Sequence, residues 1–338
     1  MSSKQKQVES SSSKRSSWRS SLLTFLIAIA ITAIGFFYGA TITDWVKGFA
    51  YTPSEQVAAT NNRIGFTPRG QQIFYATFPS VEDKTQFNAS CSSGERTVAI
   101  LGCYVGDRIY LYNIQNAELD GTLEVTAAHE MLHAAYQRLN YFERQQVDAM
   151  IKSEYETIKD VPAISQIMQY YKIAEPGAEL DELHSIIGTT IRELPGPLEA
   201  YYGRYFTNRN AVVILNEKYN AVFSSLTAEA DELQKKIDAD GKQLQRDMAT
   251  YGVDLNQLNL DIQSFNARAN SGGFSTQSEF TTARLALEAR VAALNARRTA
   301  LNARADAYNT DIARLNALAV HVNKLNESIN GVEAPSGV

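Results

Sequence analysis

The sequence is poor in cysteine and histidine, with 2 of the first and 4 of the second among 338 residues. Two cysteines alone do not build a zinc site of the closed, four-ligand kind. The chain also lacks a surplus of basic residues, since 32 lysines and arginines stand against 37 aspartates and glutamates. This balance leaves no basic stripe, and it excludes nucleic acid as a partner of the folded part.

One long stretch, residues 20–43, has no formal charge and consists mostly of apolar residues. As a helix it is long enough to cross about 30 Å of hydrocarbon, and it exceeds the core of an ordinary signal peptide. Residues 1–19 carry five basic residues and one acidic residue, Glu9. The positive-inside rule therefore predicts a single-pass protein of the cell membrane, with a cytoplasmic N-terminus and extracytoplasmic C-terminal domains.

The two cysteines, Cys91 and Cys103, both fall on the predicted outer side of the membrane. Disulfides form and persist in that oxidising compartment. The sequence thus predicts a Cys91–Cys103 disulfide, with a pair of buried free thiols as the alternative.

Between the apolar stretch and residue 210 the pattern predicts a small α+β domain. Residues 97–105 and 108–114 are rich in β-branched and aromatic residues, and Gly106-Asp107 between them indicates a hairpin. We expect 108–114 to be an edge strand that can pair with an extended peptide. Helical patterns cover the region around the two paired histidines and residues 68–75, 141–159, 163–173, 178–191 and 196–207.

Heptad patterns dominate the rest of the chain. Two long heptad segments flank residues 270–276, which predicts an antiparallel coiled-coil hairpin with its tip there. Asparagines recur every seven residues, each one position after a seam residue, at 259, 266, 295, 302, 309, 316, 323 and 330. These asparagines form amide hydrogen bonds beside the seam or a polar docking stripe. The alternative is that they only specify the register of the two helices in a structural rod.

The predicted organisation follows from these boundaries. In order, it comprises a disordered cytoplasmic tail (1–19), a transmembrane helix (20–43), a linker (44–63), a mostly helical domain (64–210), the coiled-coil hairpin (211–330) and a disordered tail (331–338).

The stretch TAAHEMLHAAY (126–136) holds two of the four histidines. On a helix, His129 and His133 lie one turn apart on one face, where both imidazoles can bind one ion. Glu130 is rotated by about 100° from His129, so it lies beside such an ion and can take a proton from a bound water. The alternative is a pair of histidines satisfied by local hydrogen bonds.

This H-E-x-x-H motif resembles that of the zinc metallopeptidases. His133 is followed by AAYQRL, which lacks the third histidine of the metzincin branch. What remains is similar to the gluzincin branch, in which a glutamate on a later helix is the third ligand. The resemblance covers residues 122–192 and implies a zincin-like domain that binds one Zn²⁺ through His129 and His133, with Glu130 as the catalytic base.

The resemblance also implies a third ligand on the helix within residues 176–194. We favour Glu182, because ELHSIIG is similar to the gluzincin pattern of a ligand glutamate followed by small or polar and then apolar residues. Glu179, on the same helical face, and His184 remain alternatives.

Supporting roles have several candidates. Asp181, Glu124 or a backbone carbonyl can accept the second N–H of a ligand imidazole. His184, Tyr201 and Tyr202 are candidates for orienting a ligand or stabilising an oxyanion, with core packing as the simpler interpretation of the tyrosines.

These features predict a membrane-anchored, extracytoplasmic zinc metallopeptidase that hydrolyses a peptide or protein substrate. Its coiled coil would be a stalk or adaptor that binds an envelope protein. The alternative is a non-enzymatic cell-envelope tether whose coiled coil carries the function and whose metal site is structural or vestigial. Glu130 discriminates between the two, because a structural zinc site needs no base and is closed by four protein ligands.

Overall fold

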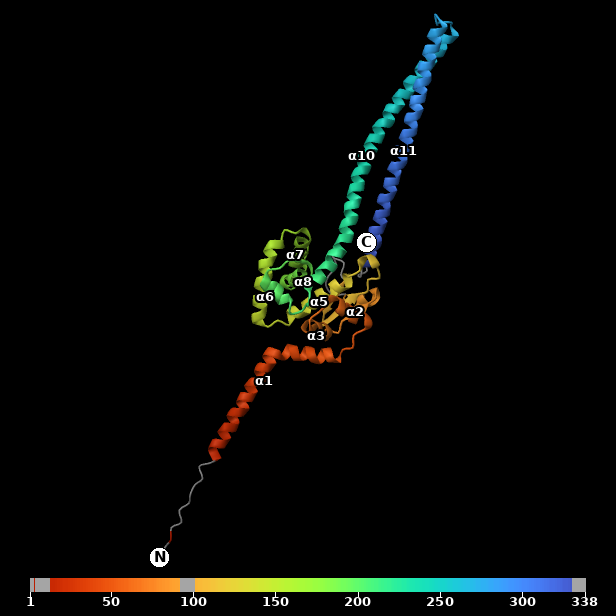
Figure 1. Ribbon diagram of the computed structural model, residues 1–338. Coiled ribbons are helices and arrows are strands. Elements are labelled where there is room, and N and C mark those ends of the chain that lie inside the picture. The colour runs from red at the N-terminus through yellow and green to blue at the C-terminus, as the bar shows by residue number, and fades with distance from the viewer. Residues whose placement is uncertain (1–2, 4–12, 92–100, 330–338) are drawn as a thin grey trace. The chain divides into compact units, whose positions relative to one another are not determined.

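The computed structural model describes residue 3 and residues 13–91 and 101–329 (Figure 1). The chain divides into two compact units, one of residues 1–219 together with 328–338 and one of residues 220–327. The described residues are mostly helical, with a small three-stranded sheet and two long C-terminal helices. The predicted tail 331–338 and most of the predicted tail 1–19 lie outside the described residues, as does Asn330.

Helix α1 (Ser13–Ala50) contains the whole stretch that the sequence predicts to cross a membrane. Its C-terminal part packs on α3 (Pro68–Ala76), where the buried carboxylate of Asp44 accepts hydrogen bonds from Arg138 Nε at 2.8 Å and Arg69 Nη1 at 3.3 Å. Among the described residues, no helix combines the length and the apolar character that a membrane crossing requires.

Besides α1 and α3, the described part of the first unit contains eleven elements before the long helices. They are α2 (Glu55–Ile64), β1 (Ser80–Glu82), α4 (Lys84–Ser90), β2 (Gly102–Val105), β3 (Arg108–Tyr112), the short 3-10 helix η1 (Ala117–Leu119), α5 (Thr122–Gln137), α6 (Tyr141–Ile158), α7 (Pro162–Ala174), α8 (Glu179–Thr190) and α9 (Gly196–Tyr202).

Several of these helices begin at side chains that satisfy the free N–H groups of the first turn. Ser54, Thr67 and Asp83 cap α2, α3 and α4 in this way, and Pro68 occupies the first turn of α3 as the sequence predicts. Asn140 and Glu143 form a complete capping box at the start of α6.

The sheet has the strand order β1-β3-β2. β2 and β3 form the predicted antiparallel hairpin, with Gly106 and Asp107 in the left-handed region at its turn. The expectation that residues 108–114 form an edge strand is wrong, because β1 pairs with β3 in parallel from Ser80 opposite Tyr110. The edge strands of this sheet are β1 and β2. Residues 97–100, which the sequence predicts to belong to the first strand of the hairpin, lie outside the described part of the chain.

Helix α5 is central to the core of the first unit. It contacts α8, α2, α3, β2 and β3. Apart from Tyr136, the apolar side chains that it buries are small or flexible, namely Ala127, Ala128, Met131, Leu132, Ala134 and Ala135. A Cβ at Gly188 of α8 would lie 2.4 Å from Leu132 and 2.8 Å from Tyr202, so glycine is needed where α8 approaches α5.

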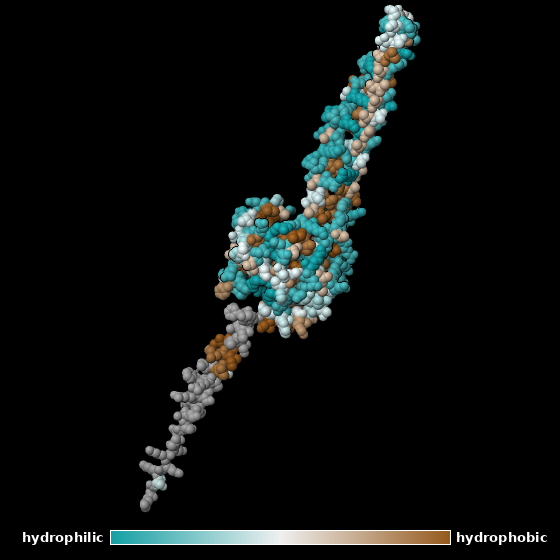
Figure 2. Space-filling model, viewed as in Figure 1, coloured by the Kyte–Doolittle hydropathy of each residue, from teal (hydrophilic) through white to brown (hydrophobic). Residues whose placement is uncertain are grey.

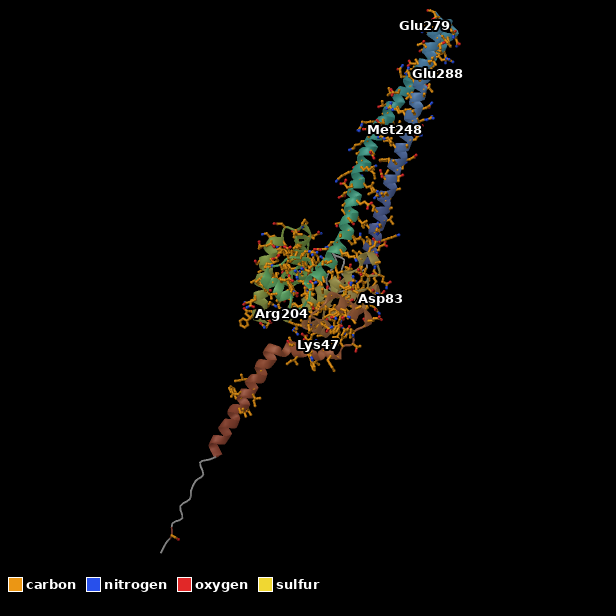
Figure 3. The ribbon with its side chains drawn as sticks, in the orientation of Figure 1. Lys47, Asp83, Arg204, Met248, Glu279 and Glu288 are labelled. Atoms are coloured by element: carbon orange, nitrogen blue, oxygen red, sulfur yellow. A yellow bond between two sulfur atoms is a disulfide. The ribbon has the colours of Figure 1, made fainter. Side chains whose placement is uncertain are left out.

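The second unit is an antiparallel hairpin of α10 (Arg209–Asn270) and α11 (Gln277–Ile329), which reverses at the predicted tip. Leu258 and Leu301 are buried along the seam. At the tip, Glu279 pairs with Arg268 and accepts a hydrogen bond from the backbone N–H of Ser275 at 2.8 Å (Figure 3). The hairpin therefore forms from heptad packing plus a locally closed turn.

The first residues of α10 belong to the first unit, which we call the globular unit. The boundary between the units therefore lies after residue 219, further along the chain than the predicted boundary after residue 210. Arg209 is only 2% exposed. Its Nη2 donates to the backbone carbonyl of Arg192 at 2.9 Å and to Glu199 Oε2 at 2.6 Å, and its Nη1 donates to the carbonyl of Ile191. This guanidinium satisfies carbonyls at the C-terminal end of α8.

We predict that Arg209→Met lowers the free energy of unfolding of the globular unit by about 3 kcal/mol, because buried carbonyls at the end of α8 lose their donors. Arg192→Met is the matched control, since Arg192 pairs with Glu217 on the surface and its loss should leave stability nearly unchanged. Urea unfolding followed by near-UV circular dichroism of the tyrosines measures both. Equal stabilities of the two variants would contradict the assigned role of Arg209.

Candidate metal centre

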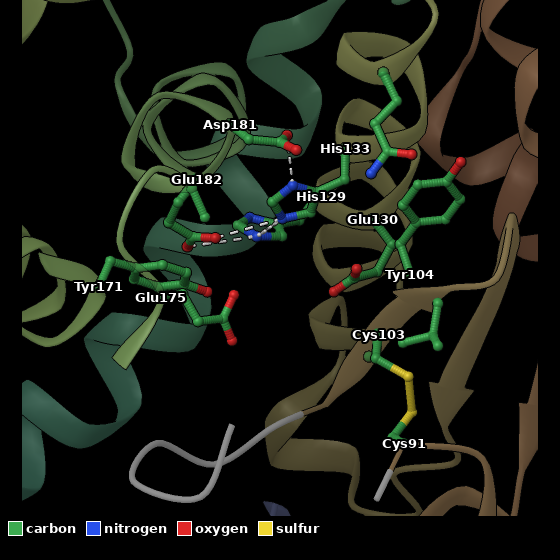
Figure 4. Close-up of a pocket in the computed structure, with 14 residues that line it drawn as sticks. Cys91, Cys103, Tyr104, His129, Glu130, His133, Tyr171, Glu175, Asp181 and Glu182 are labelled. Atoms are coloured by element: carbon green, nitrogen blue, oxygen red, sulfur yellow. Dashed lines mark hydrogen bonds and ion pairs between the residues drawn. A yellow bond between two sulfur atoms is a disulfide. The ribbon is translucent and has the colours of Figure 1, made fainter. Parts of the chain in front are cut away.

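Two helices bring three potential metal ligands together. His129 and His133 project from one face of α5, and Glu182 projects from the first turn of α8 toward them (Figure 4). The Nε2 atoms of the two histidines are 3.1 Å apart. Glu182 Oε1 lies 3.6 Å from His129 Nε2, and Oε2 lies 3.4 Å from His133 Nε2.

These separations suit a small tetrahedral ion. Ligand atoms bound to zinc at about 2.0–2.1 Å with tetrahedral angles are about 3.3–3.4 Å from one another. The three measured separations, 3.1, 3.4 and 3.6 Å, bracket that value. Among the described residues, His129, His133 and Glu182 form the group whose ligand atoms could share one ion. The donor set of two imidazoles and one carboxylate is that of an open zinc site.

The hydrogen bond behind His133 sets the direction of its lone pair. Asp181 Oδ1 lies 2.8 Å from His133 Nδ1. A hydrogen on Nδ1 therefore donates to Asp181, which leaves the Nε2 lone pair facing His129 and Glu182. Glu182 is 6% exposed, and its Oε2 has no well-oriented hydrogen-bond donor within the described part of the chain. Several acceptors thus face one point, an arrangement that a cation stabilises.

Electrostatics at the site agree with this geometry. Burial disfavours a charged His133, but hydrogen bonds to Asp181 and Glu182 outweigh it and raise the pKa of His133 well above its usual value. Burial likewise opposes ionisation of Glu182, yet the charges and hydrogen bonds of His129 and His133 lower its pKa. Without a metal, the site therefore attracts a proton to the place where the positive charge of an ion would lie.

Glu130 lies beside the three ligands and not among them. It is 7% exposed and lines the same cleft. The neighbouring backbone comes from β2, where a Cβ on Gly102 would lie 3.0 Å from Glu130 Cγ and 2.5 Å from Thr126 Cγ2. Glycine at this position lets β2 approach the face of α5 that carries Thr126 and Glu130.

The cleft in front of the ligands has a volume of about 410 Å³. Its walls are β2 on one side and the end of α7 with the start of α8 on the other. Tyr171 and Glu175 line the second wall, and Figure 4 shows both beside Glu182. Sequence reasoning missed these two residues, because nothing in their local pattern indicates that α7 ends at the cleft.

The alternatives for the third ligand do not reach the cluster. Glu179 turns back and accepts a hydrogen bond from the backbone N–H of Gly177 at 2.7 Å. His184 is completely buried on the other side of α8, with its Nε2 2.8 Å from Tyr201 Oη. Burial and the charges of His133 and His129 lower the pKa of His184 well below its usual value, so His184 stays neutral.

The suggested oxyanion roles of His184, Tyr201 and Tyr202 are not supported by their positions. Tyr202 Oη donates to the backbone carbonyl of His184 at 2.7 Å, and both tyrosines belong to the buried core. All three side chains pack behind α8, and none of them lines the cleft. The tyrosines that line the cleft are Tyr104 and Tyr171.

The structure joins Cys91 and Cys103 in a disulfide, the pair that the sequence predicts. Both cysteines line the cleft, and Cys103 belongs to the edge strand β2. The bond ties the C-terminal end of α4 to this strand and restricts the unfolded chain between the two cysteines.

We predict that the purified chain binds one zinc ion and that Asp181→Asn weakens this binding by about 10- to 100-fold, because the imidazole of His133 loses the acceptor that orients it. Glu179→Gln changes the carboxylate one helical turn before Glu182, and this variant should bind zinc as tightly as the native chain does. Isothermal titration calorimetry measures both affinities. Identical affinities of Asp181→Asn and the native chain would show that this contact does not support the ligand.

Because the pKa of His133 is raised, zinc must displace a proton from this site. We expect zinc affinity to fall as pH falls, and to keep rising with pH above the ordinary histidine pKa of about 6.5. Titrations in buffers of different ionisation enthalpy count the released protons. An affinity that is constant between pH 6 and 8 would contradict this assignment.

No protein family matches the chain, and no curated protein or solved structure matches it either.

Proposed function

We propose that this protein is a zinc-dependent metallopeptidase of the gluzincin type, anchored by α1 in the cell membrane with its cleft outside the cytoplasm. The observation that carries the proposal is the convergence of His129, His133 and Glu182 at the floor of an open cleft, with Glu130 beside them. The resemblance of the motif to H-E-x-x-H peptidases and the apolar stretch at residues 20–43 support it.

The ligand set leaves room for chemistry. Three protein ligands in the described residues, with the cleft on their open side, are typical of catalytic sites and not of closed structural ones. This favours an enzyme over a tether with a structural metal. A bound zinc ion polarises a carbonyl and lowers the pKa of its water to about 7.

The chain's own residues would then carry the proton transfers. Glu130 accepts a proton from the attacking water and returns it to the amine that leaves. Asp181 holds the His133 ring in the required tautomer. Tyr171, on the opposite wall, can donate a hydrogen bond to the substrate carbonyl oxygen.

The edge strand β2 supplies a place for the peptide backbone. Gly102, Cys103, Tyr104 and Val105 all line the cleft. An extended peptide that adds to the outer edge of β2 would lie across the face of α5 that carries Glu130. In this proposal the long hairpin positions the globular unit or binds an envelope protein, and it takes no part in the chemistry.

We predict that Glu130→Gln abolishes peptide cleavage, with a loss of about 10²- to 10⁴-fold, while one zinc ion per chain is retained. The amide has nearly the shape of the carboxylate but cannot accept the proton. Glu179→Gln serves as the control and should cleave normally. Cleavage of a peptide library and metal analysis test both variants. Equal cleavage by Glu130→Gln and the native chain would exclude Glu130 as the base.

The charge of the cleft predicts a substrate preference. Glu130, Glu175, Asp181 and Glu182 line it, and no lysine or arginine does so among the described residues. A divalent ion offsets only two of these charges, so we expect peptides with lysine or arginine near the scissile bond to be cleaved roughly tenfold faster than those with glutamate. Glu175→Gln should reduce this ratio in kcat/KM, and added salt should reduce it too. A ratio near one in the native chain would contradict the expectation.

A further inference from the structure

The outer surface of α11 has an unusual composition between residues 292 and 323. We call one side of it the Asn–Ala face, and along this face small and amide side chains repeat with the heptad. Figure 2 shows hydrophilic and hydrophobic residues mixed along the surface of the long hairpin. A single residue of this face, Asp306, carries a formal charge. The face consists of the exposed residues 292, 295, 296, 299, 302, 303, 306, 309, 310, 313, 316, 317, 320 and 323.

The opposite flank of the seam already holds the two helices together. Asp261 pairs with Arg290 at 2.6 Å, and Asp254 pairs with Arg297 at 2.7 Å. Further pairs continue the series along the hairpin, namely Asp247 with Arg304, Lys236 with Asp311 and Glu229 with Arg314. Because these pairs specify the register of the hairpin, the asparagines are not needed for it.

The asparagines of α11 have no such partners. Their side chains at 295, 302, 309, 316 and 323 are exposed, and none makes a hydrogen bond within the described residues. Asparagine is roughly 0.5 kcal/mol per residue less favourable than alanine in a helix, so the five together cost on the order of 2–3 kcal/mol. No contact within the described part of the hairpin offsets this cost. Water satisfies these exposed amides in a single hairpin, and a helix with the same amide repeat can take the place of that water.

We propose that the Asn–Ala face binds the same face of a second copy of this chain. The amide spacing of seven residues, about 10.5 Å along the helix, matches a partner helix with the same repeat. An asparagine amide both donates and accepts, so two asparagine ladders are complementary to one another. With a single charge on each face, two copies do not repel each other.

The small side chains of the Asn–Ala face also allow a helix to bind as the partner. Alanine at 292, 296, 303, 313 and 317 lets a second backbone approach to the short end of the usual interhelical range of 8–10 Å. The ladder is symmetric about Asn309. A two-fold axis there pairs Asn302 with Asn316 and Asn295 with Asn323, so an antiparallel dimer uses every amide just as a parallel one does.

Site-directed cross-linking of the full-length chain tests this face. Asn302→Cys, Asn309→Cys and Asn316→Cys are oxidised one at a time, beside Asn256→Cys and Gln263→Cys on the exposed surface of α10 as controls. We expect disulfide-linked dimers at all three ladder positions in a parallel dimer, or at Asn309→Cys alone in an antiparallel one. Cross-linking no stronger than in the controls would overturn the proposal.

A charge substitution gives an independent readout. The triple variant Asn302→Glu, Asn309→Glu and Asn316→Glu places three negative charges on each face, so we expect the dimer to dissociate at least tenfold more readily in sedimentation experiments. Thr250→Glu, Asn256→Glu and Gln263→Glu on α10 form the matched control and should remain dimeric. Circular dichroism verifies that both variants keep their helix content. A native chain that is monomeric, or a dimer that the ladder variant leaves intact, would refute this interface.

Discussion

The contact between α5 and the first turn of α8 is the interaction on which the rest of the account depends. The helices approach closely because α8 has Gly188 against Leu132 of α5, where a Cβ would lie 2.4 Å from the leucine side chain. This packing carries a carboxylate from one helix to the histidine pair of the other. A histidine pair on a single helix binds an ion weakly, whereas the third ligand from α8 completes an open tetrahedral set.

The same contact concentrates groups that are costly to bury. Glu182 is nearly inaccessible, and Asp181 lies directly behind His133. Buried carboxylates require compensating positive charge or hydrogen bonds, and here the imidazoles provide part of it. An ion at their centre would satisfy all three ligands at once, and it would make the fold of this region depend on metal. The disulfide and the capped helices stabilise the fold around this site, whose polar groups are costly to bury.

Local patterns predicted much of this from the sequence. The histidine spacing depends only on helix geometry. Glu182 was favoured because ELHSIIG is similar to the gluzincin pattern, whereas Glu179 on the same helical face remained an alternative. The hairpin turn at Gly106 and Asp107 and the heptads of α10 and α11 are also local signals. Asp181 was among several candidates, and only the packing of α8 on α5 shows which of them reaches His133.

Non-local features could not be predicted in this way. β1 is three residues long, too short to give a recognisable strand pattern. Its pairing with β3 therefore had no sequence signal, and this pairing is why 108–114 is not an edge strand. For Tyr201 and Tyr202 the sequence left a polar role at the site beside core packing, the simpler interpretation, and only the structure shows that both belong to the core. Tyr171 and Glu175 reach the cleft only because of where α7 ends.

X-ray absorption at the zinc edge of the metal-loaded chain determines directly which atoms bind the ion. We expect a four-coordinate ion with two imidazole nitrogens, one carboxylate oxygen and one further light atom from solvent, all at about 2.0–2.1 Å. A sulfur ligand, a fourth protein ligand that closes the site, or a spectrum with a single imidazole would contradict it.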